Sequence, residues 1–89
     1  LTEALILVHE TGIQAVIADL LVSIGQQTRL IKNQALVEGA STRMLIYAAR
    51  LILDGMSPRD SCEMTIVNAL SDDCDVLESL RALVDAHFE

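Results

Sequence analysis

Glycine and proline divide this chain into short helical segments, and this punctuation limits its fold more than any other feature. Gly12 and Gly55 are placed as helix-ending glycines, and Ser57-Pro58 combines an N-cap serine with proline at the first helical position. Between these signals apolar residues recur every three or four positions, and no segment alternates as a strand would. Eighty-nine residues suffice for one domain. We therefore predict an all-α fold, a compact bundle of four to five short helices.

Five helical segments are expected from the caps and the apolar periodicity. The first covers about residues 1–10, and the second runs from about 13 to 32 or 33, where Gly25 can introduce a kink. The third follows a cap at Ser41 or Thr42, the fourth follows Ser57 with Asp60 at its third position, and Ser71 caps the last. The predicted buried residues are Ile13, Ile17, Leu20, Leu21, Ile24, Ile31, Leu45, Ala48, Ala49, Ile52, Leu53, Ile66, Val67, Leu70, Val76, Leu77, Leu80, Leu83, Val84 and Phe88.

The charge balance excludes some partners. The sequence contains thirteen acidic and six basic residues, which gives a net charge of -7. The basic residues are scattered along the chain and do not form a stripe. Nucleic acids and anionic membrane surfaces both require a basic surface, so neither is expected as a partner. The most apolar stretch, residues 13–24, is too short to span a bilayer, and no signal peptide is visible. We expect a cytoplasmic protein without membrane insertion.

The sequence contains few residues that bind metals or form disulfides. Cys62 and Cys74 do not form a CxxC pattern, and a zinc site requires four ligands. His9 and His87 lie near opposite ends of the chain, without ligand spacing. We expect no metal site, and the cysteines are interpreted as small core or helix-end residues.

The segment Glu38-Gly39-Ala40-Ser41-Thr42-Arg43 departs from a local rule. An arginine in the first turn of a helix interacts unfavourably with the positive end of the helix dipole. A carboxylate at the same place would stabilise the helix. Free N–H groups at a helix start, joined by a guanidinium, suit a phosphate, and small residues before the helix keep side chains away. The alternative is a solvated Arg43 paired with Glu38. Arg43, with Ser41 and Gly39, is the candidate phosphate-binding group.

Two further clusters invite a functional interpretation. Asp72, Asp73 and Asp75 lack the spacing of a calcium loop and fit dipole-matched capping. Asp60-Ser61 is similar to the serine that bears phosphopantetheine in carrier proteins, which would predict a mass gain on Ser61. Ser61 falls inside the predicted helix, however, so an ordinary surface serine is the favoured interpretation.

No complete catalytic site is present in the sequence. It has no GxxxxGK[ST] loop, no strand followed by acidic residues that would hold magnesium, and no Ser–His–Asp or Cys–His arrangement. The chain therefore cannot carry out phosphoryl or acyl transfer by itself. It does not begin with Met, and its first residues already have a helical pattern, so we expect a fragment of a longer protein.

Several of these motifs together resemble the C-terminal region of the CbbQ/NirQ/NorQ family, in the MoxR branch of AAA+ ATPases. The resemblance covers nearly the whole chain and is weakest from residue 1 to residue 24. It is carried by Glu38-Gly39-Ala40-Ser41-Thr42-Arg43-Met44-Leu45-Ile46-Tyr47-Ala48-Ala49-Arg50-Leu51-Ile52 and Gly55-Met56-Ser57-Pro58-Arg59, and also by Thr28-Arg29-Leu30-Ile31-Lys32, Leu70-Ser71-Asp72-Asp73 and Phe88.

The resemblance implies that residues 1–89 are the helical lid of an ATPase whose nucleotide-binding core, with its ATP and magnesium, is absent from this sequence. Carried over, the sensor-2 arginine, which reaches from the lid to the nucleotide phosphates, is Arg43. The broader branch often has proline where this chain has Thr42, so here the helix start depends on hydroxyl capping.

The resemblance also implies a ring-shaped homo-oligomer, usually a hexamer, that works with a partner protein bearing a von Willebrand factor A domain. Such proteins are chaperone-like activators of a target such as Rubisco or nitric oxide reductase. ATPase activity would then belong to the full-length protein and not to this domain alone. The alternative is a stand-alone helical interaction module without nucleotide, with Leu36 and Val37 as its apolar patch.

Arg29 and Lys32 form either a solvated basic face or a contact with a partner or nucleotide.

Overall fold

The computed structural model describes residues 2–31, 39–70 and 73–88, and these ranges contain helices and no strand. The helices are α1 (Glu3–Thr11), α2 (Ala15–Ile31), α3 (Thr42–Leu53), α4 (Pro58–Cys62), the π-helix η1 (Glu63–Val67), α5 (Asn68–Leu70) and α6 (Cys74–His87). Because α4, η1 and α5 follow one another directly, they make up the fourth predicted segment. The predicted all-α bundle is confirmed.

Side-chain caps set most of the helix starts. Ser41 and Ser57 accept hydrogen bonds from the backbone N–H three residues ahead, and Pro58 occupies the first turn of α4, as predicted. The cap predicted for the last helix was wrong. The helix begins at Cys74, and the Asp73 carboxylate caps it by accepting from two backbone N–H groups. Ser71 lies outside the described residues, and Asp73 both caps the helix and complements its dipole.

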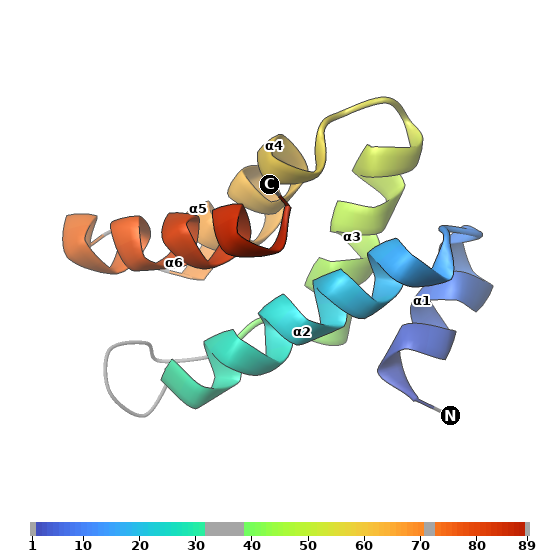
Figure 1. Ribbon diagram of the computed structural model, residues 1–89, viewed down its shortest axis with the longest axis horizontal. Helices are drawn as coiled ribbons and strands as arrows, with labels where there is room; N and C mark the ends of the chain where they lie inside the picture. The colour runs from blue at the N-terminus through green and yellow to red at the C-terminus, as the bar shows by residue number, and fades with distance from the viewer. Residues whose placement is uncertain (1, 32–38, 71–72, 89) are drawn as a thin grey trace.

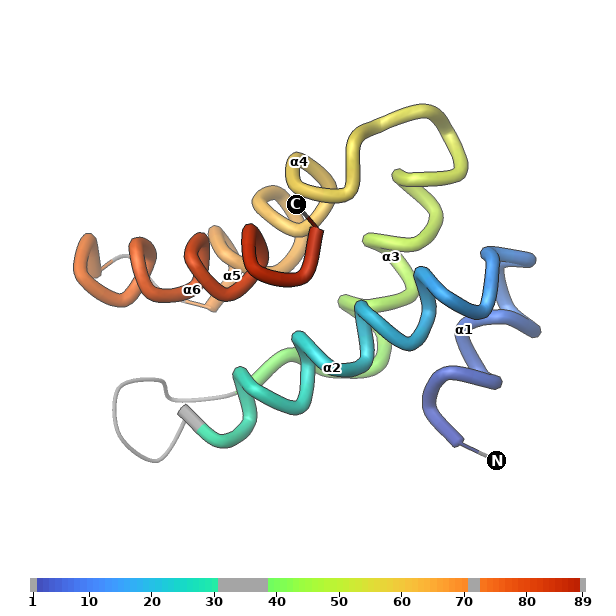
Figure 2. The backbone as a smooth tube through the Cα atoms, viewed as in Figure 1, coloured from blue at the N-terminus to red at the C-terminus, as the bar shows by residue number. Residues whose placement is uncertain are grey.

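The helices form two groups that meet around α2 and α3 (Figures 1 and 2). Helix α1 packs against α2 and α3 near the N-terminus, and α6 packs against α2, α4 and η1. Helix α3 connects the groups because it contacts α1 and α2 as well as α4 and η1. No helix among the described residues is long and apolar enough to cross a membrane.

The core lies between these helices and is aliphatic. Its largest fully buried apolar side chains come from five helices: Leu7, Leu21, Ile24, Leu45, Ile66, Val67 and Leu80. Among the predicted core residues whose burial the structure describes, one is wrong. Leu53 is 51% exposed, because it ends α3 one position beyond the face formed by Leu45, Ala48, Ala49 and Ile52.

Helix α2 continues through Gly25 without the break that the sequence allowed. A Cβ at this position would lie 3.0 Å from Cδ1 of Leu45. Glycine at this position therefore lets α3 pack closely on α2, which brings the start of α3 near the end of α2.

Candidate functional site

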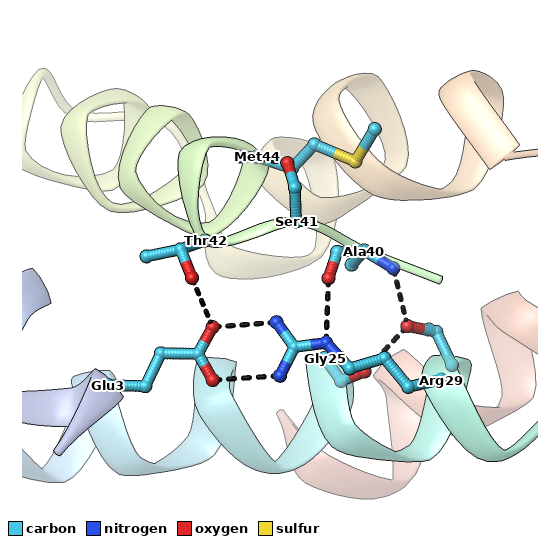
Figure 3. Close-up of polar contacts among 8 residues, drawn as sticks. Glu3, Gly25, Arg29, Ala40, Ser41, Thr42 and Met44 are labelled. Atoms are coloured by element: carbon cyan, nitrogen blue, oxygen red, sulfur yellow. Dashed lines mark hydrogen bonds and ion pairs between the residues drawn. The ribbon is translucent and has the colours of Figure 1, made fainter. Parts of the chain in front are cut away.

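The N-terminal end of α3 carries the predicted site, and the segment before it is bound to α2 (Figure 3). The buried Thr28 accepts a hydrogen bond from the Ala40 N–H at 2.9 Å and donates its own proton to the Gly25 carbonyl at 2.7 Å. The neighbouring Arg29 donates from Nε to the Ala40 carbonyl at 2.9 Å. Both backbone polar groups of Ala40 are therefore satisfied by successive residues of α2.

Glu3 joins this segment to α1. Arg29 donates from its two terminal nitrogens to the two carboxylate oxygens of Glu3, at 2.8 and 2.6 Å. The Thr42 hydroxyl donates to Oε2 of the same carboxylate at 2.7 Å. We call Glu3, Arg29 and Thr42 the Glu3 clamp, because one carboxylate holds side chains from the two other helices (Figure 3).

The clamp is partly shielded from water, which strengthens its charged contacts. The side chain of Glu3 is 16% exposed and that of Arg29 35%. The Arg29 hydrogen bonds hold the pKa of the Glu3 carboxyl below its usual value, against the opposing effect of burial, and the Thr42 bond lowers it further. The same pairing raises the pKa of Arg29.

Gly39 has a structural reason to be glycine. A Cβ there would lie 2.6 Å from Cγ, 2.7 Å from Cα and 2.9 Å from the backbone nitrogen of Arg29. Contacts that short to backbone atoms do not occur, so no larger residue fits without displacing the segment from α2. The small residue predicted to leave room for a phosphate thus allows the chain to lie against α2.

Arg43 itself is exposed in the first turn of α3, directly after the clamp. Ser41, also exposed, caps the helix by accepting a hydrogen bond from the Met44 N–H at 3.2 Å. Within the described parts of the chain, no hydrogen bond or ion pair involves the Arg43 side chain. Glu38, its alternative partner, lies outside the described residues. The geometry therefore presents a guanidinium to solvent from a firmly held helix start.

Sequence reasoning missed the clamp. Arg29 was interpreted as part of a solvated basic face, which is wrong, because its guanidinium is bound to Glu3 and Ala40. The partners lie 26 and 11 residues away along the chain, and no local pattern relates them. The only sequence signal was Thr28-Arg29 within the family resemblance. Lys32 lies outside the described residues, as do Leu36 and Val37, the patch expected for an interaction module.

The carrier-type interpretation of Ser61 is excluded by burial. Ser61 is 0% exposed and donates its hydroxyl proton to the Ser57 carbonyl at 2.9 Å, so no prosthetic group can reach it. The prediction of an ordinary surface serine was also wrong.

The next residue, Cys62, is buried, and desolvation raises the pKa of its thiol to about 12. Cys74 is exposed, and neither cysteine is in a disulfide.

A second polar cluster lies between α4, η1 and α6. A shallow groove of about 240 Å³ is lined there by Arg59, Arg81, Asp60, Glu63, Asp85 and Val84. Arg81 pairs with Glu63 at 2.8 Å and Arg59 with Asp85 at 3.3 Å. Because both arginines already have acidic partners, this groove suits an external anion less well than the N-terminal end of α3.

The described residues contain no group of three or more side chains placed to hold a metal ion.

The sequence matches a family described as CbbQ/NirQ/NorQ C-terminal over residues 3–87. The denitrification regulatory protein NirQ of Pseudomonas aeruginosa is 47% identical over 85 residues, which cover 96% of this chain and 33% of NirQ. Protein CbbQ of Hydrogenophilus thermoluteolus is 40% identical over 86 residues, 97% of this chain and 32% of CbbQ. Protein NorQ of Paracoccus denitrificans is 40% identical over 68 residues, 76% of this chain and 25% of NorQ. The chain thus spans about a third or less of the length of these curated relatives.

Proposed function

The chain belongs to the CbbQ/NirQ/NorQ C-terminal family, and we propose that it is the helical lid of an AAA+ ATPase that contributes Arg43 as sensor-2 arginine. The observation that carries this proposal is an exposed guanidinium, without a partner among the described residues, on a helix start that α1 and α2 hold in place. In this proposal ATP and magnesium bind in a core outside the present sequence, and the lid closes over them.

Elementary electrostatics supports a phosphate as the ligand of Arg43. The start of α3 combines the positive end of the helix dipole with a cation, an arrangement that destabilises a bare helix and is relieved by an anion. Ser41 caps the turn, and Gly39 lets the preceding segment lie against α2. A guanidinium bound to the terminal phosphate loses that contact when the phosphate leaves, so hydrolysis would be linked to lid position.

The proposal for the whole protein is a chaperone-like activator that works in the cytoplasm as a hexameric ring with a von Willebrand factor A-domain partner. Its target is a metabolic enzyme of the Rubisco or nitric oxide reductase type. The names of the relatives support a regulatory role, since two of them, from Pseudomonas aeruginosa and Stutzerimonas stutzeri, are called denitrification regulatory proteins.

The experiment that tests the role of Arg43 compares Arg43→Ala with Arg50→Ala in the full-length protein. Arg50 is also exposed on α3, two turns further on, so its loss controls for charge on this helix. Arg43→Ala should lower ATP turnover by roughly 10- to 100-fold, the effect of removing a charged hydrogen bond made in the transition state. Arg50→Ala should retain turnover.

Circular dichroism of both variants should show an unchanged helical content, because neither side chain is buried. Normal turnover in Arg43→Ala would refute the sensor-2 assignment. An equal loss in both variants would mean that charge on α3, and not a contact of Arg43, matters.

A further inference from the structure

We propose that the Glu3 clamp is a positioning device for Arg43, with the Thr42 hydroxyl as the group that transmits the position of α1 to the arginine. This inference rests on the proposed function of Arg43. It assigns a role in the nucleotide response to Glu3, Arg29 and Thr42, which lie on three helices and which the sensor assignment does not include.

The Thr42 hydroxyl makes no hydrogen bond within its own helix. Thr42 begins α3, but Ser41 is the N-cap and accepts from the Met44 N–H. The Thr42 proton instead goes to Oε2 of Glu3 at 2.7 Å, the oxygen that also accepts from Arg29 at 2.6 Å. One atom, Oε2 of Glu3 in α1, therefore accepts hydrogen bonds from both α3 and α2.

The residues that precede Arg43 are anchored one after another. Gly39 lies against the backbone of Arg29, Ala40 is bound through its N–H and its carbonyl, and Thr42 is bound through its side chain. Thr42 is the last of these anchors and the direct neighbour of Arg43. In a helix the Cα of the next residue has no independent freedom, so fixing Thr42 fixes the origin of the Arg43 side chain.

The anchored start of α3 contrasts with the exposed side chain of Arg43 that it carries. Glu3 is 16% exposed and its contacts are charge-assisted, hence short and strong. Arg43 is exposed and unpaired among the described residues. A long side chain reaches a phosphate with the right geometry only if its base is placed correctly, and a shift of about 1 Å can cost up to 100-fold in rate. Loss of the Thr42 bond should therefore impair the response to phosphate more than it impairs the fold.

The test uses three hydroxyl variants in the full-length protein. Thr42→Val keeps the branched shape but removes the donor, and Thr42→Ser keeps the donor. Thr65→Val is the matched control, because the Thr65 hydroxyl donates to the Ser61 carbonyl at 2.7 Å, within the continuous segment formed by α4 and η1 and not to a residue of the clamp. Turnover is measured together with the ratio of the affinities for a non-hydrolysable ATP analogue and for ADP.

Thr42→Val should lower turnover roughly three- to thirtyfold and reduce the preference for the triphosphate over ADP by a similar factor. Thr42→Ser should restore both values to within about twofold of the wild type, and Thr65→Val should leave both unchanged. A merely structural role would not change the triphosphate preference. Equal effects of Thr42→Val and Thr65→Val would therefore overturn the proposal.

A double-mutant cycle with Arg43→Ala supplies the decisive readout. If Thr42 acts through Arg43, Thr42→Val should have no further effect on turnover in the Arg43→Ala background. Additive losses would refute positioning while leaving the sensor-2 role intact. Normal turnover in Arg43→Ala alone would instead refute the proposed function. If Thr42→Val does not fold, Glu3→Asp tests the same clamp from α1, since it withdraws the carboxylate by one methylene, and the same non-additivity is expected.

Discussion

Glu3 joins α1, α2 and α3 through the charge-assisted contacts of one carboxylate. Its carboxylate accepts three hydrogen bonds, two from Arg29 and one from Thr42, and no buried side-chain polar atom among the described residues lacks a partner. Hydrogen bonds to a charged group stabilise more than neutral ones, and removing one partner leaves the other poorly solvated. The clamp should therefore contribute measurably to stability, and its contribution should depend on pH.

The pH dependence follows from the lowered pKa of Glu3. Because the carboxyl ionises more readily in the folded state than at its ordinary value of 4.5, its stabilising effect is complete above about pH 4.5 and is lost as the pH falls through the folded value. In Glu3→Gln we expect the free energy of unfolding to be about 1–2 kcal/mol lower at pH 7, with the difference shrinking below pH 4.5. Urea unfolding of the isolated domain between pH 7 and 3 measures this.

Glu10→Gln is the control, since Glu10 is an exposed carboxylate on the same helix. Its stability profile should follow the wild type. A destabilisation by Glu3→Gln that stays constant from pH 7 to pH 3 would contradict the role of the ionised carboxylate.

For single residues, the sequence predicted the features that depend on neighbours in the chain. It did not predict the contacts that depend on residues distant in the sequence. The place of Arg43 in the first turn of a helix and a cap at Ser41 or Thr42 were predicted, because both follow from the local start of a helix. The pairing of Arg29 with Glu3 was not, because it exists only when α1 and α2 are packed together. The nucleotide contact of Arg43 remains a proposal.

Among the elements, the contact of α2 with the chain entering α3 depends on two glycines that differ in kind. Gly25 faces the end of the Leu45 side chain, at 3.0 Å from an added Cβ, and a flexible side chain can give way. Gly39 faces the backbone of Arg29, at 2.7 Å from its Cα, and a helix backbone cannot. The two glycines should therefore respond differently to the same substitution.

Gly39→Ala should lower the free energy of unfolding by about 1–3 kcal/mol, as overpacking against a rigid neighbour does. Gly25→Ala should cost less, because the gain in helix propensity of about 1 kcal/mol offsets part of the contact with Leu45. Chemical denaturation of the two variants gives the comparison. The reverse order would show that the segment at Gly39 can leave α2 without cost.

The helix boundaries that could be predicted from the sequence are those that depend on nearby residues. Caps and glycines predicted the C-terminal end of α1, both ends of α3 and the start of α4, because each depends on hydrogen bonds between residues close in the sequence. The π-helical turns of η1 were not predicted, because no local sequence signal distinguishes them from an ordinary helix. The close approach at Gly39 also depends on where α2 lies.

The dimensions of the whole molecule match those of a compact globular domain of the same length. Its radius of gyration is 12.0 Å, the value of about 12 Å that packing scaling gives for 89 residues. Its accessible surface of 5232 Å² is close to the roughly 5100 Å² expected for a monomer of 9.7 kDa. The bundle is therefore as compact as an independent domain, although the chain spans only about a third of the length of its relatives.

We accordingly expect residues 1–89 to fold by themselves and yet to lack ATPase activity. Calorimetry should show one cooperative transition, with an unfolding enthalpy of about 60 kcal/mol near 60 °C for a domain of this length. Hydrolysis should be absent because the sequence has no phosphate-binding loop, and one exposed arginine cannot enclose a nucleotide. A broad transition with binding of a hydrophobic dye would mean that the aliphatic core needs another domain to cover it. ATP hydrolysis by the isolated domain would mean that the catalytic groups lie within these helices, and it would remove the basis for a lid.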